Sequence, residues 1–135
     1  MLQIKDLTEQ ETEKIEKGLE AYDDAHMPAR FQGGVQIGAY VDGILAGGVN
    51  ACMTAFRILY VSTVFVESEY RGRGIGRALM EETERRARQL GASLIRLDTF
   101  DWQGKAFYHA LGYEVVGQYE SREDGFSEFF FLKRL

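Results

Sequence analysis

The sequence predicts a single α/β domain in which helices cover both faces of a mixed, mostly antiparallel sheet of about six to seven strands. Its 135 residues are enough for one hydrophobic core. Alternating apolar residues flank Asp42-Gly43, a dipeptide that favours a tight hairpin turn, so the strands on either side are expected to be antiparallel. Further on, a buried strand, an amphipathic helix and a second buried strand predict a parallel crossover. Residues 1–135 are therefore expected to form one domain.

The N-terminal part is expected to contain a short strand and then a helix. Residues 2–7 alternate apolar and polar side chains, and Thr8 and Glu11 have the spacing of a capping box. Residues 23–33 lack a sustained periodicity and are expected to be irregular or briefly helical. The apolar stripe of the helix comprises Ile15, Leu19 and Tyr22.

The central part is expected to contain three strands and a long helix. The hairpin strands occupy residues 35–56, and Gly47-Gly48 in the second strand predicts a bulge or a close approach of two backbones. Residues 58–66 are almost continuously apolar, as in a strand covered on both faces. The inward face of the helix comprises Ile75, Ala78, Leu79, Thr83, Ala87 and Leu90. Its other faces carry the favourable pairs Glu81/Arg85, Glu82/Arg86 and Glu84/Arg88.

The C-terminal part is expected to add a strand, a short helix and a hairpin. Residues 93–99 are typical of a buried strand, and residues 113–119 and 126–132 of a closing hairpin. Asp101 can cap the short helix between them. The apolar residues 129–132 complete the core or contribute to a homodimer, and both alternatives stay open. One face of the short helix comprises Trp102, Ala106, Phe107, Ala110 and Leu111.

Charge and residue counts argue against several classes of function. Sixteen Lys and Arg against 21 Asp and Glu give a net charge of −5, which disfavours binding to nucleic acid or to an anionic membrane. Cys52 and two histidines are a poor supply of metal ligands, so no metal site is expected. The N-terminus lacks the apolar core of a signal peptide, and no segment reaches the ~20 apolar residues of a spanning helix. A cytoplasmic location is therefore expected.

The most informative segment, residues 70–77, lies between a buried strand and the long helix. Its glycines allow successive backbone N–H groups to point into one concavity, where the helix N-terminus adds partial positive charge. Such a turn binds a phosphate or a pyrophosphate. It lacks the lysine of a P-loop and the third glycine of a dinucleotide fingerprint. The alternative is a basic, exposed turn that uses glycine only for its tight geometry.

Two motifs resemble the GNAT superfamily of acyl-CoA-dependent N-acetyltransferases. The first, which in that family follows the fourth strand, is Arg71-x-x-Gly74-x-Gly76. The second lies on the helix after the fifth strand, where many members have Asn and Ala at the first two named positions. In this chain the second motif reads Asp101-x-x-Gly104-x-x-Phe107-Tyr108-x-x-x-Gly112-Tyr113.

The resemblance implies that acetyl-CoA is the cofactor and that the two central parallel strands splay apart to admit it. The backbone of Val64, Phe65 and Val66 would pair with the pantetheine like an added strand, and a backbone N–H near Val66 would stabilise the oxyanion. Asp101 would contact the cofactor or only cap its helix. The residues that would hold the pyrophosphate are Arg71, Gly72, Arg73, Gly74, Ile75, Gly76 and Arg77.

The reaction implied is direct attack of a primary amine on acetyl-CoA in a ternary complex. Tyr108 is the candidate general acid for the departing thiolate; the alternative is a buried ring whose hydroxyl bonds to a backbone carbonyl. No general base is assigned. The acidic residues near the expected strand ends are candidates, but each is equally explained as a solvated carboxylate or as an ion-pair partner, for example Asp98 with Arg96. These residues are Asp98, Glu67 and Glu69.

The acceptor is expected to be a small-molecule or peptide amine. Acidic residues in segment 23–33 and in the closing hairpin would favour a cationic acceptor, and solvated turns on an acidic protein explain them equally well. These residues are Asp23, Asp24, Glu120, Glu123, Asp124 and Glu128. A different class of function is a non-catalytic acyl-CoA-binding sensor or protein-interaction module, which would share the glycine turn but need no acceptor pocket.

Overall fold

The computed structural model describes residues 1–27 and 31–135, which belong to two compact units, Met1–Arg30 and Phe31–Leu135. The expected irregular segment 23–33 therefore lies partly outside the described residues. Among the helices that the structure describes, none combines the length and the apolar character needed to cross a membrane.

The first unit contains one helix, α1 (Glu9–Asp24). Its capping box is confirmed, because the Glu11 N–H donates to the Thr8 hydroxyl (3.1 Å) and the Thr8 N–H donates to the Glu11 carboxylate (3.0 Å). The strand expected at residues 2–7 is wrong, since this segment is irregular. Alternation alone does not make a strand, because an isolated strand without a partner in its own unit has no ladder to stabilise it.

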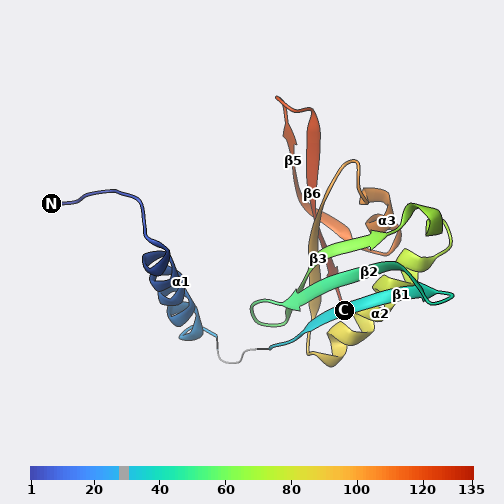
Figure 1. Cartoon of the computed structure of the whole chain (residues 1–135), viewed down its shortest axis with the longest axis horizontal. Coiled ribbons are helices and arrows are strands. Elements are labelled where there is room, and N and C mark those ends of the chain that lie inside the picture. Colours follow the sequence, from blue (N-terminus) through green and yellow to red (C-terminus); the bar gives the residue numbers. More distant parts are fainter. Residues whose placement is uncertain (28–30) are drawn as a thin grey trace. The chain divides into compact units, whose positions relative to one another are not determined.

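The second unit is built on one mixed sheet, and the predicted mostly antiparallel architecture is confirmed. The strand order is β1-β2-β3-β4-β6-β5, with β3 and β4 as the parallel pair. The turn between β5 and β6 projects beyond the other strands (Figure 1), while residues 128–134 of β6 pair with β4. The strands are β1 (Gly34–Val41), β2 (Ile44–Met53), β3 (Ile58–Val66), β4 (Leu94–Phe100), β5 (Glu114–Ser121) and β6 (Phe126–Arg134). The helices are η1 (Ser68–Tyr70), α2 (Ile75–Gln89) and α3 (Lys105–Ala110).

The first hairpin forms as its turn residues require. Asp42 and Gly43 have φ of 50° and 78°, the left-handed pair of a type I′ turn. The close approach expected at Gly47 is also confirmed, because a Cβ there would lie 2.7 Å from the backbone oxygen of Phe65. A side chain at this position would push β2 away from β3, so glycine keeps the strands in register beside the site.

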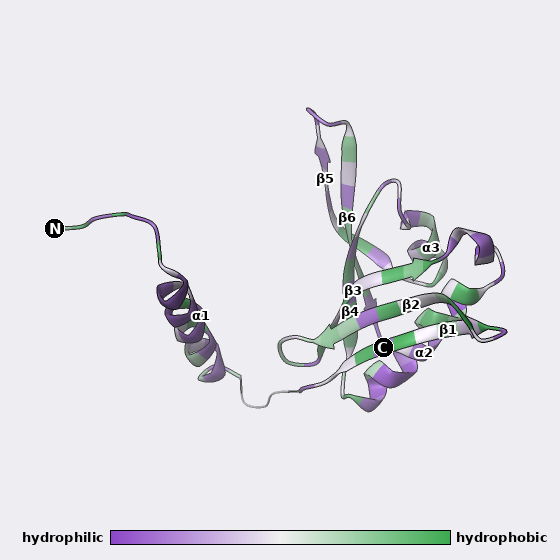
Figure 2. Cartoon of the chain, in the orientation of Figure 1, coloured by the Kyte–Doolittle hydropathy of each residue, from purple (hydrophilic) through white to green (hydrophobic). Residues whose placement is uncertain are grey.

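One hydrophobic core joins the sheet to α2 and α3, which pack on the same face. The expectation of helices on both faces therefore does not hold for these two helices. Figure 2 shows apolar stretches along β1, β2 and β3 and hydrophilic colouring over much of α2. Within residues 129–132, Phe129 and Phe131 enter this core, whereas Phe130 is 38% exposed on the other face. The strand residues of the core are Val35, Val49, Ala51, Leu59, Val61, Ile95, Leu97, Phe129 and Phe131. The buried residues of α2 are Leu79, Met80, Thr83, Glu84 and Ala87.

A largely buried ion pair ties the last strand to α2. The Lys133 ammonium donates to the Glu84 carboxylate and to the Leu111 carbonyl oxygen, both at 2.8 Å. The expected pairing of Glu84 with Arg88 is therefore wrong. Glu84 lies on the inward face of α2, where a lysine from β6 reaches it, whereas a helix partner one turn away points toward solvent.

We expect Lys133→Ala to lower the free energy of unfolding by about 3 kcal/mol, because the Glu84 carboxylate would lose its cation and keep only a bond from the Tyr113 hydroxyl at 3.4 Å, and the Leu111 carbonyl would lose its donor. Urea denaturation measures this change. Arg86→Ala is the control: Arg86 pairs with Glu82 at the surface at 3.4 Å, and its loss should change stability by less than about 1 kcal/mol. Equal effects of the two substitutions would contradict a structural role for the buried pair.

Candidate active site

The two parallel strands at the centre of the sheet pair only briefly. Residues 58–60 of β3 pair with residues 94–96 of β4, and beyond that point no strand of this unit pairs with the free edge of β3. A cavity of about 800 Å³, called here the gap cavity, lies where they diverge. The predicted splay is thus confirmed. The lining residues are Val61, Ser62, Thr63, Val64, Phe65, Val66, Arg71, Asp98, Thr99, Trp102, Gln103, Gly104, Phe107 and Tyr108.

The free edge of β3 presents backbone groups to the gap cavity. Just beyond β3, the N–H of Glu67 donates to the Ala46 carbonyl at 2.8 Å. This bond shows that the N–H groups of the odd-numbered residues here point toward β2. Because pairing groups alternate along a strand, the N–H groups of Val64 and Val66 point to the opposite side, into the gap. An extended chain placed there could add to the sheet as a further strand.

The glycine-rich turn lies next to this edge and surrounds a second cavity of about 360 Å³, called here the turn cavity. Gly72 and Gly74 have φ of 77° and 81°, which only glycine adopts readily, and a Cβ at either position would meet open space. The lining residues are Val66, Tyr70, Arg71, Gly72, Gly74, Ile75, Gly76, Arg77, Phe107, Ala110 and Leu111.

The turn leads directly into the N-terminus of α2. Gly74 is the N-cap and supplies no side-chain hydrogen bond, and the first backbone hydrogen bond of the helix runs from the Ala78 N–H to the Gly74 carbonyl. Among the described residues, the N–H groups of residues 75–77 therefore have no protein acceptor. Together with the helix dipole they make an anion-binding site. Gly76 also lets α3 approach, because a Cβ there would lie 3.1 Å from the Phe107 ring.

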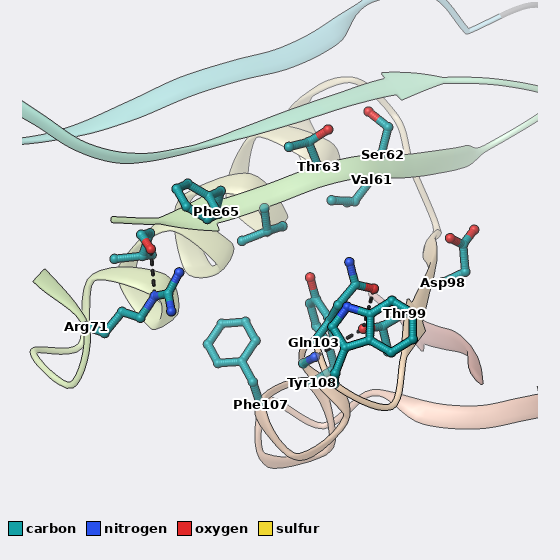
Figure 3. Close-up of a pocket in the computed structure, with 14 residues that line it drawn as sticks. Val61, Ser62, Thr63, Phe65, Arg71, Asp98, Thr99, Gln103, Phe107 and Tyr108 are labelled. Carbon is teal, nitrogen blue, oxygen red and sulfur yellow. Dashed lines mark hydrogen bonds between the residues drawn. The ribbon is translucent and has the colours of Figure 1, made fainter. Parts of the chain in front are cut away.

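The three arginines of the turn have different surroundings. Arg71 lines both cavities, and its Nε donates to the Val66 carbonyl oxygen at 2.8 Å (Figure 3). Arg77 lines the turn cavity and lies 3.8 Å from Glu81, one helical turn away. Arg73 stacks over the Tyr70 ring at 5.3 Å and lines neither cavity. The structure thus gathers every predicted turn residue except Arg73 around one concavity.

Tyr108 points from α3 into the gap cavity (Figure 3). Its side chain is 9% exposed, with ring centroids 5.8 Å from both Tyr113 and Phe131. No described residue forms a hydrogen bond with its hydroxyl, so the alternative of a hydroxyl bonded to a backbone carbonyl does not hold. Burial, and secondarily the charge of Asp98, raises the pKa of Tyr108 to about 12, so the phenol keeps its proton at neutral pH.

Asp101 does not cap α3, so that expectation is wrong. The N-cap of the helix is Gly104, which has no side-chain capping bond. The Asp101 carboxylate instead accepts a hydrogen bond from the Ser127 N–H (3.0 Å), and the Asp101 N–H donates to the Ser127 carbonyl (3.0 Å). Asp101 lines neither cavity and fastens the loop after β4 to β6.

Trp102 is likewise not on the helix. It lies in the loop before α3, stacked on Phe100 with ring centroids 4.7 Å apart. Gln103 holds this loop, since its side-chain oxygen accepts a hydrogen bond from the Phe100 N–H (2.7 Å). Both residues line the gap cavity. The sequence carries no local signal for that role, because an irregular loop has no periodic pattern that would indicate which side chains face a cavity.

Of the acidic residues considered as bases, only Asp98 lines a cavity. It accepts a hydrogen bond from the Tyr60 hydroxyl (3.1 Å), whereas no ion pair joins it to Arg96 in the described part of the chain. Glu67 and Glu69 line neither cavity.

Comparison with known proteins points to one family. A family model described as Acetyltransferase (GNAT) family matches residues 1–113. The crystal structure of an acetyltransferase from Bacillus cereus is 30% identical and aligns with a TM-score of 0.91 over 99% of this chain and 98% of that chain.

Two curated relatives carry acetyltransferase names. The blasticidin-S acetyltransferase of Streptomyces morookaense is 30% identical over 94 residues, which are 69% of this chain and 68% of that protein. The thialysine N-epsilon-acetyltransferase of Bos taurus is 35% identical over 66 residues, which are 47% of this chain and 39% of that protein.

Proposed function

Because the chain belongs to the GNAT family of acetyl-CoA-dependent N-acetyltransferases, we propose that its two adjoining cavities bind acetyl-CoA and an amine for direct acetyl transfer. The observation that carries the proposal is the continuity of the cavities, which share Val66, Arg71 and Phe107. A path therefore runs from an anion site at the N-terminus of α2 to the free edge of β3 and on to Tyr108.

The turn cavity holds the diphosphate of acetyl-CoA. The free N–H groups of residues 75–77, the open space beside Gly72 and Gly74, and the Arg77 guanidinium all favour an anion there. The pantetheine then follows β3, where Val64 and Val66 offer backbone groups to its amides. The Arg71 side chain fastens the turn to the end of β3 and contributes positive charge between the two parts of the cofactor.

The thioester lies in the gap cavity beside Tyr108. The Val66 N–H and the Val64 carbonyl pair with the pantetheine, which leaves the Val64 N–H, farther from the turn, to stabilise the negative charge that develops on the thioester oxygen as the amine attacks. When the carbon–sulfur bond breaks, the Tyr108 hydroxyl gives its proton to the thiolate. A phenol whose pKa is about 12 is fully protonated at neutral pH and so available for this step.

Amines are the acceptors that the relatives' names indicate, since thialysine N-epsilon-acetyltransferase is named for an amino group. A small amine fits the acidic chain, whose net charge of −5 disfavours nucleic acid. We also propose that residues 1–135 act as one N-acetyltransferase domain, which the alignment with the Bacillus cereus acetyltransferase over 99% of this chain supports.

The test is release of free CoA thiol from acetyl-CoA in the presence of a panel of primary amines. We expect release that depends on the amine and yields the N-acetyl product, seen by mass spectrometry. Tight binding of acetyl-CoA without thiol release for any amine would instead identify a non-catalytic acyl-CoA sensor.

A further inference from the structure

The gap cavity has two ends that differ in chemistry. Arg71 marks one end, next to the glycine turn, and Asp98 lies on the opposite side of the cavity (Figure 3). Under the proposed function, acetyl-CoA enters from the Arg71 end. The Asp98 end is then the one open to the acceptor.

Asp98 offers a carboxylate that is oriented but not neutralised. It lies on the sheet face opposite α2 and α3, because its neighbours Leu97 and Thr99 are buried in the core. The Tyr60 hydroxyl donates to its Oδ2 at 3.1 Å, while the Arg96 guanidinium stacks over the Tyr60 ring at 4.4 Å. No ion pair involves Asp98 among residues 1–27 and 31–135.

A second carboxylate, Glu128 on β6, lies on the same face. It is opposite Phe100 in the β4–β6 register, and Asp98 is opposite Phe130, so the two acids are diagonal neighbours, on the order of 7–8 Å apart between Cα atoms. The Tyr119 hydroxyl donates to Glu128 much as Tyr60 donates to Asp98. In the described part of the chain, no cation pairs with Glu128 either.

The charges of Asp98 and Glu128 both affect the two tyrosines that donate to them, Tyr60 and Tyr119. Burial is the main cause that raises the pKa of Tyr60. The hydrogen bond to Asp98 is the second cause, and the charge of Glu128 adds to the shift. The hydrogen bond to Glu128 is the main cause that raises the pKa of Tyr119, and Asp98 adds to it. The β4–β6 register, which makes the two acids diagonal neighbours on one sheet face, places both carboxylates within reach of one extended ligand.

Aromatic rings border these carboxylates. Trp102 is 66% exposed within this unit, lines the gap cavity and stacks on Phe100. The Phe126 ring packs edge-on against two other rings. Its centroid lies 5.3 Å from that of Phe100 and 5.9 Å from that of Trp102. Aromatic faces next to carboxylates favour an organic cation over a hydrated metal ion, because the ring attracts the cation and covers its alkyl part.

An independent feature links this end of the cavity to the reaction. The Tyr108 side chain is more than nine-tenths buried, and its unpartnered hydroxyl is directed into the same cavity. Because Asp98 and Tyr108 line the same cavity, an amine held by Asp98 would lie near the thioester that Tyr108 serves.

We propose that the acceptor is a primary amine that carries a second cationic group, such as a linear diamine, with its reactive ammonium on Asp98 and its second cation near Glu128. This proposal rests on the proposed function. Asp98 binds and orients the amine, and the proton that the ammonium must lose passes to water.

The reaction balances with water as the proton carrier. The ammonium loses a proton to water, and the amine nitrogen attacks the acetyl carbon. The carbon–sulfur bond breaks, and the thiolate takes the Tyr108 proton. The nitrogen then sheds its second proton, which returns through water to the Tyr108 oxygen, leaving an amide and free CoA.

The test compares 1,4-diaminobutane with n-butylamine, two primary amines that differ in the second cation. We expect the wild type to prefer the diamine in kcat/KM by about tenfold or more. Glu128→Gln should remove that preference by raising the KM for the diamine. Asp98→Asn should lower kcat/KM for both amines by about ten- to a hundredfold, mainly through the amine KM, and leave the KM for acetyl-CoA unchanged. Asp42→Asn, in the first hairpin turn, is the matched control and should change neither amine.

Two outcomes separate this proposal from the proposed function. Equal kcat/KM for the two amines would overturn the acceptor assignment and leave acetyl transfer intact. If no amine were acetylated, the proposed function would fail, and calorimetry of diaminobutane with the CoA-loaded protein would still decide the acceptor site. Binding that Asp98→Asn weakens about tenfold or more supports the assignment, and its absence overturns it.

Discussion

Gly74→Glu is expected to weaken CoA binding by roughly a hundredfold or more. Two like charges ~4 Å apart near a protein surface repel by about 4 kcal/mol, and the new carboxylate would stand in the space that the diphosphate needs. The backbone adds to the effect, since Gly74 has φ of 81° and a side chain there is strained. Isothermal titration calorimetry with CoA measures the change.

Gly125→Glu is the matched control for this experiment. Gly125 lies in the turn between β5 and β6, has φ of 71° and also faces open space. Its substitution introduces the same charge and a similar backbone strain but lies outside both cavities. CoA affinity should therefore stay close to that of the wild type. A similar loss in both variants would show that strain, and not the anion site, explains the result for Gly74.

Tyr108→Phe is expected to lower kcat by about a hundredfold or more while changing the KM for acetyl-CoA little, because a proton donor acts only as the thiolate leaves. The substitution removes one oxygen and keeps the ring packed against Tyr113 and Phe131, so the fold is retained. Steady-state kinetics measures both constants. Tyr40→Phe, on the exposed side of β1, is the control and should have wild-type kcat. Full turnover in the Tyr108 variant would remove this residue from the mechanism.

The pH dependence follows from the same tyrosine. Burial raises the pKa of Tyr108 to about 12, so its acid form persists from neutral pH to well above pH 10. Deprotonation of this group therefore does not lower kcat as the pH rises toward 10, whereas an unperturbed phenol, with a pKa near 10, would. The raised pKa also means that the folded state holds a proton that the unfolded chain loses near pH 10. Its contribution to stability is complete below pH 10 and is lost as the pH rises toward 12.

Local patterns were sufficient for the elements that position the turn. Asp42-Gly43 fixes the first hairpin, the apolar residues 58–66 form β3, and the glycines between β3 and α2 adopt the positive φ that their spacing indicates. These features depend on backbone preference and periodicity within a few residues, which a sequence displays directly.

Long-range contacts account for what the sequence could not predict. Asp101 looked like a helix cap, yet its carboxylate binds the Ser127 N–H, 26 residues away on β6. Asp98 looked like a partner of Arg96, yet it accepts a bond from Tyr60, 38 residues away. In both cases a strand pairing brought in a partner that no local spacing reveals. Residues 2–7 alternate as a strand does, but in their unit no neighbouring strand completes a ladder.

The most direct test is a crystal structure of the protein with CoA. The diphosphate should lie at the N-terminus of α2, accepting hydrogen bonds from the N–H groups of residues 75–77, and the pantetheine should pair with the free edge of β3 at Val64 and Val66. A diphosphate bound elsewhere, with those N–H groups occupied by protein or solvent in the complex, would contradict the assignment of both cavities.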